Sequence, residues 1–242
     1  MCRQRLASAL LLACAGLALA ADAPDIPAFA TARPGTELPA GWQRYTLGKP
    51  ERVTRYSLVE LDGKVVLKAE ADASVSAVIH PLRADPKESP WLSWTWRTEN
   101  TLAHADIRTK EGDDYVARVY VLFDYDVSKL PLLERARIAA ARLIYGDPIP
   151  TAGLCYVWDN RQVVGYTAWS AYTRRLRMIV AANAASGTGR WVKEEHNIVE
   201  DYRKAFGEEP PPVTAVIVAT DTDNTREKAV SYFGDITLRS AP

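Results

Sequence analysis

Apolar and polar residues alternate along much of the chain, in short runs separated by turn residues. Residues 91–97 are the clearest example, because Leu92, Trp94 and Trp96 fall on one face of an extended chain and polar residues on the other. A period of two is typical of a β-strand with one buried face. The same reasoning predicts further strands at residues 56–61, 64–71, 75–80, 115–123, 154–158, 176–182, 213–220 and 232–238.

Turn residues and apolar runs indicate how these strands are connected and which of them lies in the middle of a sheet. Asp62 and Gly63 separate the first two, and this dipeptide favours a two-residue β-hairpin because both turn positions need a positive φ. Residues 115–123 are apolar on both faces, which indicates a central strand.

Two segments show a helical period instead. Residues 131–145 are rich in alanine, leucine and arginine, and Pro131 suits a first helical turn. A second, shorter helix is predicted after Asn197, with Glu200 three residues on and Gly207 as its end. The stripe that the first helix is expected to bury consists of Leu133, Ala136, Ala140, Leu143 and Ile144.

About ten short strands and two helices predict a mainly β fold, a jelly roll or β-sandwich of the galactose-binding-like kind with two inserted α-helices. We expect one domain over residues 42–242. The proline-rich residues 21–41 are predicted to be a leader or loop that joins it.

The N-terminus is typical of an export signal. Arg3 and Arg5 precede an apolar run at residues 6–20, which is too short for a transmembrane helix. Ala18 and Ala20 fit a cleavage site before residue 21, so residues 1–20 are predicted to be a signal peptide of a periplasmic or secreted protein. Two alternatives are a retained anchor and a lipid anchor at Cys14, which follows a short lipobox-like sequence.

Charge and cysteine content narrow the picture. Without residues 1–20 the chain has 28 basic and 30 acidic residues, a net charge of −2. Because nucleic-acid binding requires a basic excess or a basic stripe, no such partner is expected. Cys155 is then the only cysteine, and its apolar neighbours predict a buried structural thiol.

The richest polar cluster is residues 220–225, directly after a predicted apolar strand. Asp221 and Asp223 point the same way in an extended chain, and Asn224 adds an amide. Three interpretations stay open: a turn that caps its own backbone, a site for a polar ligand or Ca²⁺, and a pair of acids for catalysis.

A second acidic cluster, Asp113 and Asp114, precedes the strand that carries Arg118. In a regular strand Arg118 shares a face with Val116, so it needs a carboxylate partner if that face is buried. Asp113, Asp114 or Asp221 could supply it. One interpretation is a structural ion pair, and the other is an open sheet face where these groups bind a polar ligand such as a glycan, together with Arg97.

Aromatic residues offer stacking surfaces for sugars. Trp94 and Trp96 share the face of Leu92, so we expect them in the core. Trp158 lies next to a loop signal and is the better candidate for ligand stacking. In the last predicted strand Asp235 stands between apolar residues, a pattern similar to that of jelly-roll carbohydrate-binding modules, which implies a structural Ca²⁺ site at Asp235.

These signatures together resemble the uncharacterised, exported bacterial family catalogued as domain of unknown function three thousand and forty-seven. The resemblance implies export and supplies no activity or catalytic residues. It extends over residues 26–238 and rests on residues 91–97, 112–114, 117–120, 156–158, 201–202, 206–207, 220–225 and 232–236.

The sequence contains no specific catalytic motif. It therefore predicts a non-catalytic binding protein for a polar ligand, with a glycan as the leading candidate and no assigned catalytic residue. The alternatives are a carbohydrate-active hydrolase or lyase that uses paired aspartates, and a structural protein of the cell envelope. The predicted ligand-binding residues are Arg97, Asp113, Asp114, Arg118, Trp158, Asp221, Asp223 and Asn224, and the predicted metal ligand is Asp235.

Overall fold

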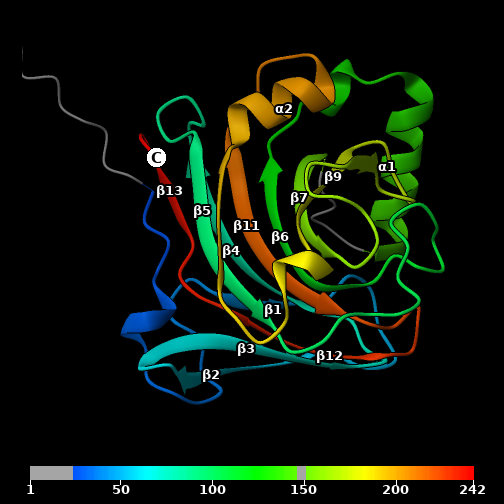
Figure 1. Ribbon diagram of the computed structural model, residues 1–242. Coiled ribbons are helices and arrows are strands. Elements are labelled where there is room, and N and C mark those ends of the chain that lie inside the picture. The colour runs from blue at the N-terminus through cyan, green and yellow to red at the C-terminus, as the bar shows by residue number, and fades with distance from the viewer. Residues whose placement is uncertain (1–23, 146–150) are drawn as a thin grey trace, which may run out of the picture.

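The computed structural model describes residues 24–145 and 151–242, which form two β-sheets packed face to face and two α-helices (Figure 1). The predicted signal peptide at residues 1–20, including Cys14, lies outside the described residues.

The larger sheet has seven strands, and its neighbours are antiparallel except for β7 and β9. In spatial order it contains β1 (Gln43–Tyr45), β4 (Ala77–Ala84), β11 (Val213–Asp221), β6 (Tyr115–Phe123), β7 (Ala152–Asp159), β9 (Leu176–Asn183) and β8 (Thr167–Trp169).

The smaller sheet has six strands, all in antiparallel pairs. Its order is β10 (Val192–Asn197), β5 (Trp91–Thr98), β12 (Lys228–Phe233), β3 (Lys64–Asp72) and β2 (Arg55–Leu61), and β13 (Thr237–Arg239) pairs with β5 as well.

The strand order identifies a jelly roll. If β3, β4, β5, β6, β7, β10, β11 and β12 are numbered one to eight along the chain, the sheets read 1-8-3-6 and 2-7-4-5. This is the order in which two Greek keys wrap into a two-sheet jelly roll. The predicted mainly β jelly roll with two inserted helices is therefore confirmed.

Local sequence signals explain several elements directly. Asp62 and Gly63 have φ values of 53° and 75° and connect Leu61 to Lys64, as a type I′ hairpin between β2 and β3 requires. Leu92, Trp94 and Trp96 of β5 are all buried between the sheets, as their alternation predicts.

The strand predicted at residues 232–238 is interrupted, and this corrects the sequence expectation. β12 ends at Phe233 and the chain resumes pairing with β5 only at Thr237. Gly234 lies close to β5, and a Cβ there would clash with the side-chain hydroxyl of Thr95. Any larger residue at this position would therefore require the Thr95 side chain to move. The short strands β1, β8 and β10 were not predicted from the sequence.

The helices follow their predicted bounds but not in every case their predicted faces. α2 (Ile198–Phe206) begins after Asn197, whose side chain accepts hydrogen bonds from the backbone N–H groups of Val199 and Glu200. It lies where β6 ends and β11 begins (Figure 1).

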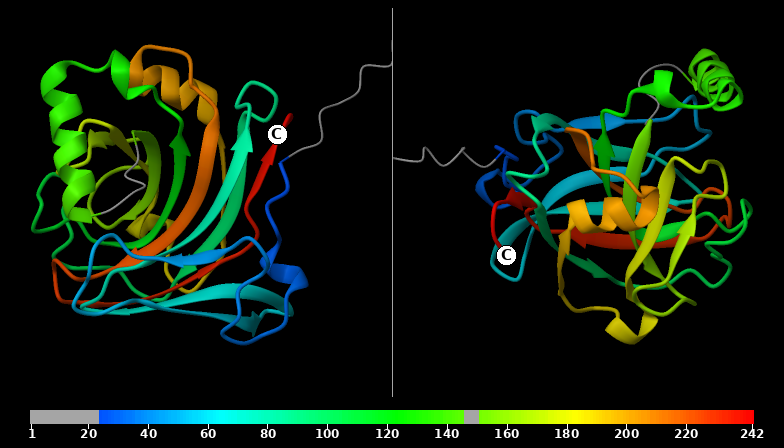
Figure 2. Two further views of the ribbon diagram at one scale, coloured as in Figure 1. Left: turned by 180° about the vertical axis from the view of Figure 1, so that it is seen from behind. Right: turned by 90° about the horizontal axis from the view of Figure 1, so that it is seen from above.

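α1 (Leu132–Tyr145) lies on the side of the seven-stranded sheet away from β5 and β10 (Figure 2). The buried residue of its described part is Ile138, whereas Leu133 and Ala140 of the predicted stripe are exposed. The prediction of that stripe was wrong, because this helix turns its Ile138 side towards the protein. The side chains of Leu143 and Ile144 lie outside the described part.

Residues 24–41 run along the sandwich. Phe29 is buried against Trp42, with ring centroids 4.9 Å apart, and the Trp42 indole N–H donates to the Pro27 carbonyl at 2.9 Å. Aromatic burial and a satisfied indole therefore hold this segment to the domain.

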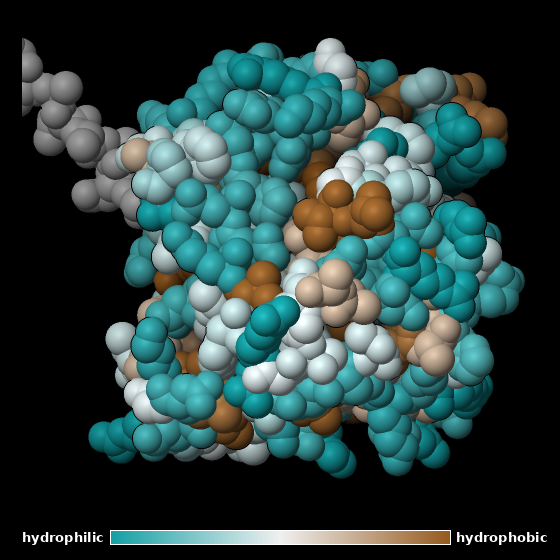
Figure 3. Space-filling view, viewed as in Figure 1, coloured by the Kyte–Doolittle hydropathy of each residue, from teal (hydrophilic) through white to brown (hydrophobic). Residues whose placement is uncertain are grey.

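The outer surface is mainly hydrophilic on the face shown in Figure 3, with apolar residues in small separate groups. Neither α1 nor α2 has the length and hydrophobicity to cross a bilayer. In the interior, Cys155 is fully buried and burial raises the pKa of its thiol to about 12, which confirms the predicted buried thiol.

Candidate functional site

The two acidic clusters of the sequence meet at one end of the sandwich. Asp113 and Asp114 precede β6, and Asp221 ends β11, the strand beside it. This is the end opposite to α2 (Figure 1). The turn at residues 222–227 then crosses from the seven-stranded sheet to β12 of the other sheet.

A β-bulge in β6 sets the direction of Arg118. Ala219 pairs with Arg118, but Asp221 pairs with Tyr115, so Thr220 alone faces two residues of β6. The extra residue turns Val116 into the core between the sheets, whereas Arg118 stays on the outer face. The prediction that Val116 and Arg118 share a face was wrong for this reason.

Arg118, Asp113 and Asp221 form a buried ion-pair group, which we call the Arg118 cluster. The Arg118 Nε donates to Asp221 Oδ1 at 2.8 Å, and its Nη2 also contacts the other oxygen of this carboxylate. Nη2 donates to the Asp113 carbonyl at 3.1 Å, and Nη1 lies 3.8 Å from the Asp113 carboxylate. Burial raises the pKa of Asp113, and the Arg118 charge only partly offsets this effect.

Asp114 holds the turn from below. Its fully buried carboxylate accepts hydrogen bonds from the backbone N–H groups of Asn224 at 3.3 Å and Thr225 at 2.6 Å. The Asn224 amide nitrogen donates to the Lys110 carbonyl at 2.7 Å and lies 3.3 Å from the Tyr172 hydroxyl. The 222–227 turn is thus held by Asp114 on one side and by Lys110 and Tyr172 on the other.

Three carboxylates converge beneath and on this turn. Oxygens of Asp114, Asp221 and Asp223 lie within 4.8 Å of one another, a set that could ligate a hard cation such as Ca²⁺. Two of the three already have partners, since Asp221 binds Arg118 and Asp114 binds two amides. Asp223 is exposed, and partial burial together with the Asp114 charge raises its pKa. Asp223 is therefore the member with free hydrogen-bonding capacity.

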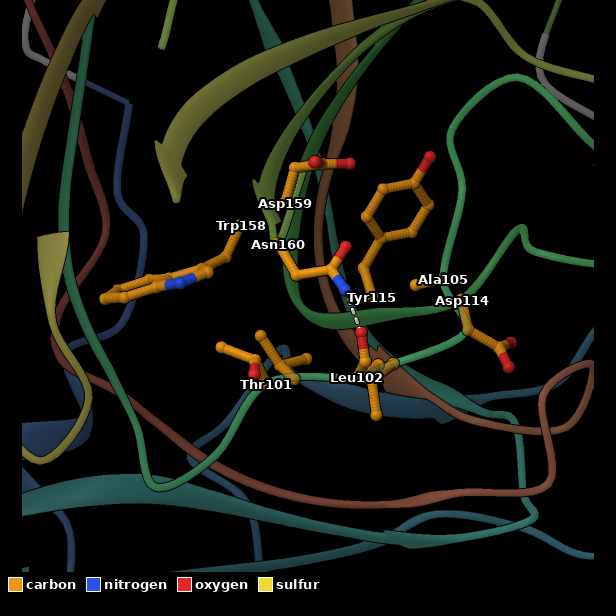
Figure 4. Close-up of a pocket in the computed structure, with 9 residues that line it drawn as sticks. Thr101, Leu102, Ala105, Asp114, Tyr115, Trp158, Asp159 and Asn160 are labelled. Atoms are coloured by element: carbon orange, nitrogen blue, oxygen red, sulfur yellow. Dashed lines mark hydrogen bonds between the residues drawn. The ribbon is translucent and has the colours of Figure 1, made fainter. Parts of the chain in front are cut away.

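A small cavity lies behind Asp114 (Figure 4). Trp158 and Asn160 line it, and the indole N–H of Trp158 and the side-chain oxygen of Asn160 have no hydrogen-bond partner among the described residues. Its free volume of about 10 Å³ holds no more than one water molecule, so it is too small for a sugar. It is lined by Thr101, Leu102, Ala105, Asp114, Tyr115, Val116, Trp158, Asp159 and Asn160.

A larger groove of about 290 Å³ opens on the other side of the turn. Three connections far apart in sequence form it: the one between β1 and β2, the one between β3 and β4, and the turn after β11. Asp223 belongs both to this groove and to the carboxylate group. The groove is lined by Leu47, Gly48, Lys49, Pro50, Glu51, Arg52, Ala73, Val75, Asp223 and Arg226.

Three of the predicted site residues lie elsewhere. Arg97 is on β5 in the other sheet, where it pairs with Glu99 at 2.8 Å. Trp158 is in the core with its ring 5.7 Å from that of Trp96, so it has no face for a ligand to stack on. Asp235 accepts a hydrogen bond from the Ala30 backbone N–H at 3.0 Å, and calcium binding there stays a prediction.

A second polar group, which we call the His196 cluster, lies where β10 meets α2. His196 stands between Glu194 and Asp201, with its ring nitrogens 3.5 and 3.6 Å from their carboxylates. The Tyr156 hydroxyl donates to Asp201 at 2.9 Å, and the imidazole stacks on Trp94 at 5.4 Å. Burial disfavours the charged imidazole, but the contacts with Asp201 and Glu194 outweigh it and raise the pKa of His196.

Sequence reasoning missed Lys110, Tyr172 and most of the groove. Lys110 and Tyr172 contact the turn only because the loop before β6 and the loop after β8 fold over it. The side chains of the groove carry no motif, and only the jelly-roll topology brings them together.

Comparisons with known proteins extend this description. The family 30 carbohydrate-binding module of the cellulosomal cellulase Cel9D-Cel44B of Clostridium thermocellum is similar over 86% of this chain and 93% of its own, with 14% identity and a TM-score of 0.38. Because this similarity is so distant, we infer nothing from it, and we identify the jelly roll from the strand order of the two sheets. No curated protein matches the chain.

The family model described as "Protein of unknown function (DUF3047)" matches residues 40–237. This range contains both sheets except the last two residues of β13. The chain belongs to this family.

Proposed function

We propose that the protein is exported and is a non-catalytic binding protein for a polar ligand, a glycan, at the end of the sandwich that carries the 222–227 turn. The observation that supports this most is the presentation of Asp223 and Asn224. Both are exposed on a turn that Asp114 fixes from below, beside a groove of about 290 Å³.

The chemistry of this end suits hydroxyl groups. A carboxylate accepts hydrogen bonds from hydroxyls, and an amide both donates and accepts. Because the backbone of the turn is already hydrogen-bonded, ligand binding does not have to order it, which preserves affinity. The exposed ring of Tyr172 adds an aromatic face next to Asn224, on which a sugar ring can stack.

The contacts of the buried acids indicate that these acids position the turn and do not react with a ligand. Asp221 is bound to Arg118, and Asp114 is bound to two backbone amides, so neither faces an open cleft. We therefore assign Asp113, Asp114, Asp221 and Arg118 to holding the turn, and Asp223 and Asn224 to contact with the ligand. The alternative of a structural envelope protein uses the same buried pairs but needs no ligand.

A glycan array probed with the purified mature protein tests the proposal. Wild type is expected to bind one class of glycan, and Asp223→Ala and Asn224→Ala are expected to weaken binding at least about tenfold. Asp124→Ala is the matched control, because Asp124 is an exposed acid at the opposite end of β6. Absence of binding by folded wild type to every glycan would contradict the proposal and favour the structural alternative.

Export is tested separately. The sequence of residues 1–20 supports cleavage before residue 21, so N-terminal sequencing of protein recovered from a periplasmic extract is expected to begin at Ala21. A mature chain that begins with a lipid-modified Cys14, or a chain that keeps Met1 in the cytoplasm, would overturn this part of the proposal.

A further inference from the structure

We infer that the groove beside the turn selects acidic saccharides, with the ligand's carboxylate held by Lys49, Arg52 and Arg226. This inference rests on the proposed function and names the class of glycan. Three properties of the groove support it: the charges of its side chains, its exposed apolar surface and the positive φ of two of its residues.

Cations outnumber carboxylates around the groove. Lys49, Arg52 and Arg226 line it, against Glu51 and Asp223. Within the described residues Lys49 has no ion pair, so its ammonium group is free for a ligand.

The two arginines are only weakly engaged. Arg226 lies 3.6 Å from Glu51, and Arg52 lies 3.9 Å from Asp72, and in both pairs the side chains are more than half exposed. Exposed ion pairs of this length contribute little to stability. A ligand carboxylate can therefore replace either partner at small cost and gain a charge-assisted hydrogen bond.

An apolar surface lies beside these charges. Leu47 is 51% exposed at the groove, and Val75 also lines it. Sugar rings have apolar C–H faces, so Leu47 offers a contact for the ring while its substituents reach polar groups. Asp223 is placed to accept hydrogen bonds from hydroxyls. Lys49 and Arg52 of the connection between β1 and β2, with Arg226 of the turn, are placed to bind the acid.

The backbone of the groove is strained where it carries these groups. In the described part of the chain three residues other than glycine have a positive φ, and two of them, Ala73 at 47° and Arg226 at 61°, line the groove. The third, Asp62, is in the hairpin turn where a positive φ is required. Such strain costs free energy and gathers at binding and active sites.

Hydrogen bonds hold both strained residues in place. The Arg226 N–H donates to the Thr222 carbonyl at 2.9 Å, and the Ala73 N–H donates to the Glu227 carbonyl at 3.0 Å. The conformation therefore fixes the stem of Arg226 next to Asp223. Glycine would adopt this φ without the steric cost that the Arg226 side chain adds.

The test compares oligosaccharides of uronic acids with the same oligosaccharides after their carboxyl groups have been reduced to primary alcohols. By isothermal titration at low salt, wild type is expected to bind the acidic set at least about tenfold more tightly. This preference is expected to shrink as salt screens the charges. A poly-glutamate peptide of similar charge is the third probe.

Variants of the groove sharpen the result. Arg226→Gly removes a cation and relieves the strain, so it is expected to weaken uronate binding while the melting temperature stays equal or rises. Lys49→Gln is expected to weaken it as well, and Arg226→Lys to retain most of it. Arg83→Ala, an exposed arginine that pairs with Asp124, is the matched control.

The outcomes separate this inference from the proposed function. Equal or tighter binding of the reduced saccharides would overturn the acidic preference and leave glycan binding intact. Equal binding of poly-glutamate would show selection for charge alone and would also overturn it. If folded wild type binds neither saccharide set but binds another glycan on the array, the inference fails and the proposed function stands. If it binds no glycan at all, both fail.

Discussion

The Arg118 cluster is buried and the His196 cluster is partly buried, and the two groups differ in whether their cation can lose its charge. The Arg118 guanidinium is ionised at every pH that a protein meets, whereas an imidazole can lose its proton, and the contacts with Asp201 and Glu194 raise the pKa of His196. The first cluster is therefore a permanent support for the 222–227 turn. The second is a support for α2 whose strength depends on pH. Four predictions test this difference.

The largest effect is expected from Asp221→Ala. This variant leaves Arg118 buried without its main partner, and removing one member of a buried ion pair costs about 3–5 kcal/mol. Urea unfolding monitored by tryptophan fluorescence measures the loss. An effect below 1 kcal/mol, similar to that of Asp124→Ala, would mean that water reaches Arg118, and the permanent support would then be refuted.

Asp114→Ala is expected to cost about 1–3 kcal/mol, since it leaves the backbone N–H groups of Asn224 and Thr225 without their acceptor. The same change is expected to loosen the turn, and therefore to weaken glycan binding although Asp114 touches no ligand. Amide hydrogen exchange of residues 222–227 checks this. Unchanged exchange with weakened binding would instead place Asp114 in direct contact with the ligand.

Tyr156→Phe tests the second cluster with a smaller change. The phenol donates to Asp201, and a single hydrogen bond to a charged group contributes about 1–3 kcal/mol, less where water can replace it. The expected loss is at the lower end, because Asp201 keeps its contacts with His196 and Lys204. A glycan affinity that changes with this variant would show that the two clusters are coupled.

The smallest effect is the pH dependence of His196. Its pKa is raised in the folded protein, so its contribution is complete below the pKa of the unfolded chain and is lost as pH rises through the folded pKa. The titratable groups in contact with it are Glu194, Asp201 and Tyr156, and Lys204 in turn pairs with Asp201.

The stability difference between wild type and His196→Gln should thus fall as pH is raised from mildly acidic to mildly basic values. Equilibrium unfolding across this range measures it. The lowered pKa of Asp201 acts at the acidic end, where its contribution is lost as pH falls. A difference that grows towards high pH would reverse the assignment of charge to His196.

Local patterns predicted the fold well. The Asp62-Gly63 hairpin, the buried face of β5 and the cap of α2 each depend on neighbours in the sequence, so the sequence alone identifies them. The bulge at Val116, by contrast, depends on how β11 pairs with β6. The break at Gly234 depends on the approach of β5.

The sequence predicted which residue types form the site, but it did not predict how their side chains are arranged. The sequence left Asp113, Asp114 and Asp221 as equal candidates for pairing with Arg118. In the structure Asp221 binds the guanidinium most directly, Asp113 lies beside it and Asp114 holds the turn instead. The groove could not be predicted, since the positive φ of Ala73 and Arg226 and the meeting of three connections leave no trace in residue type.

The burial of Cys155 makes the protein its own reporter of local opening. From residue 24 onward it is the only thiol, and it packs with Ile107, Tyr115 and Met178 on the outer face of the larger sheet. A thiol reagent can reach it when the segments that cover this face move away. The labelling rate of unmodified protein therefore measures how often this cover opens, without any engineered probe.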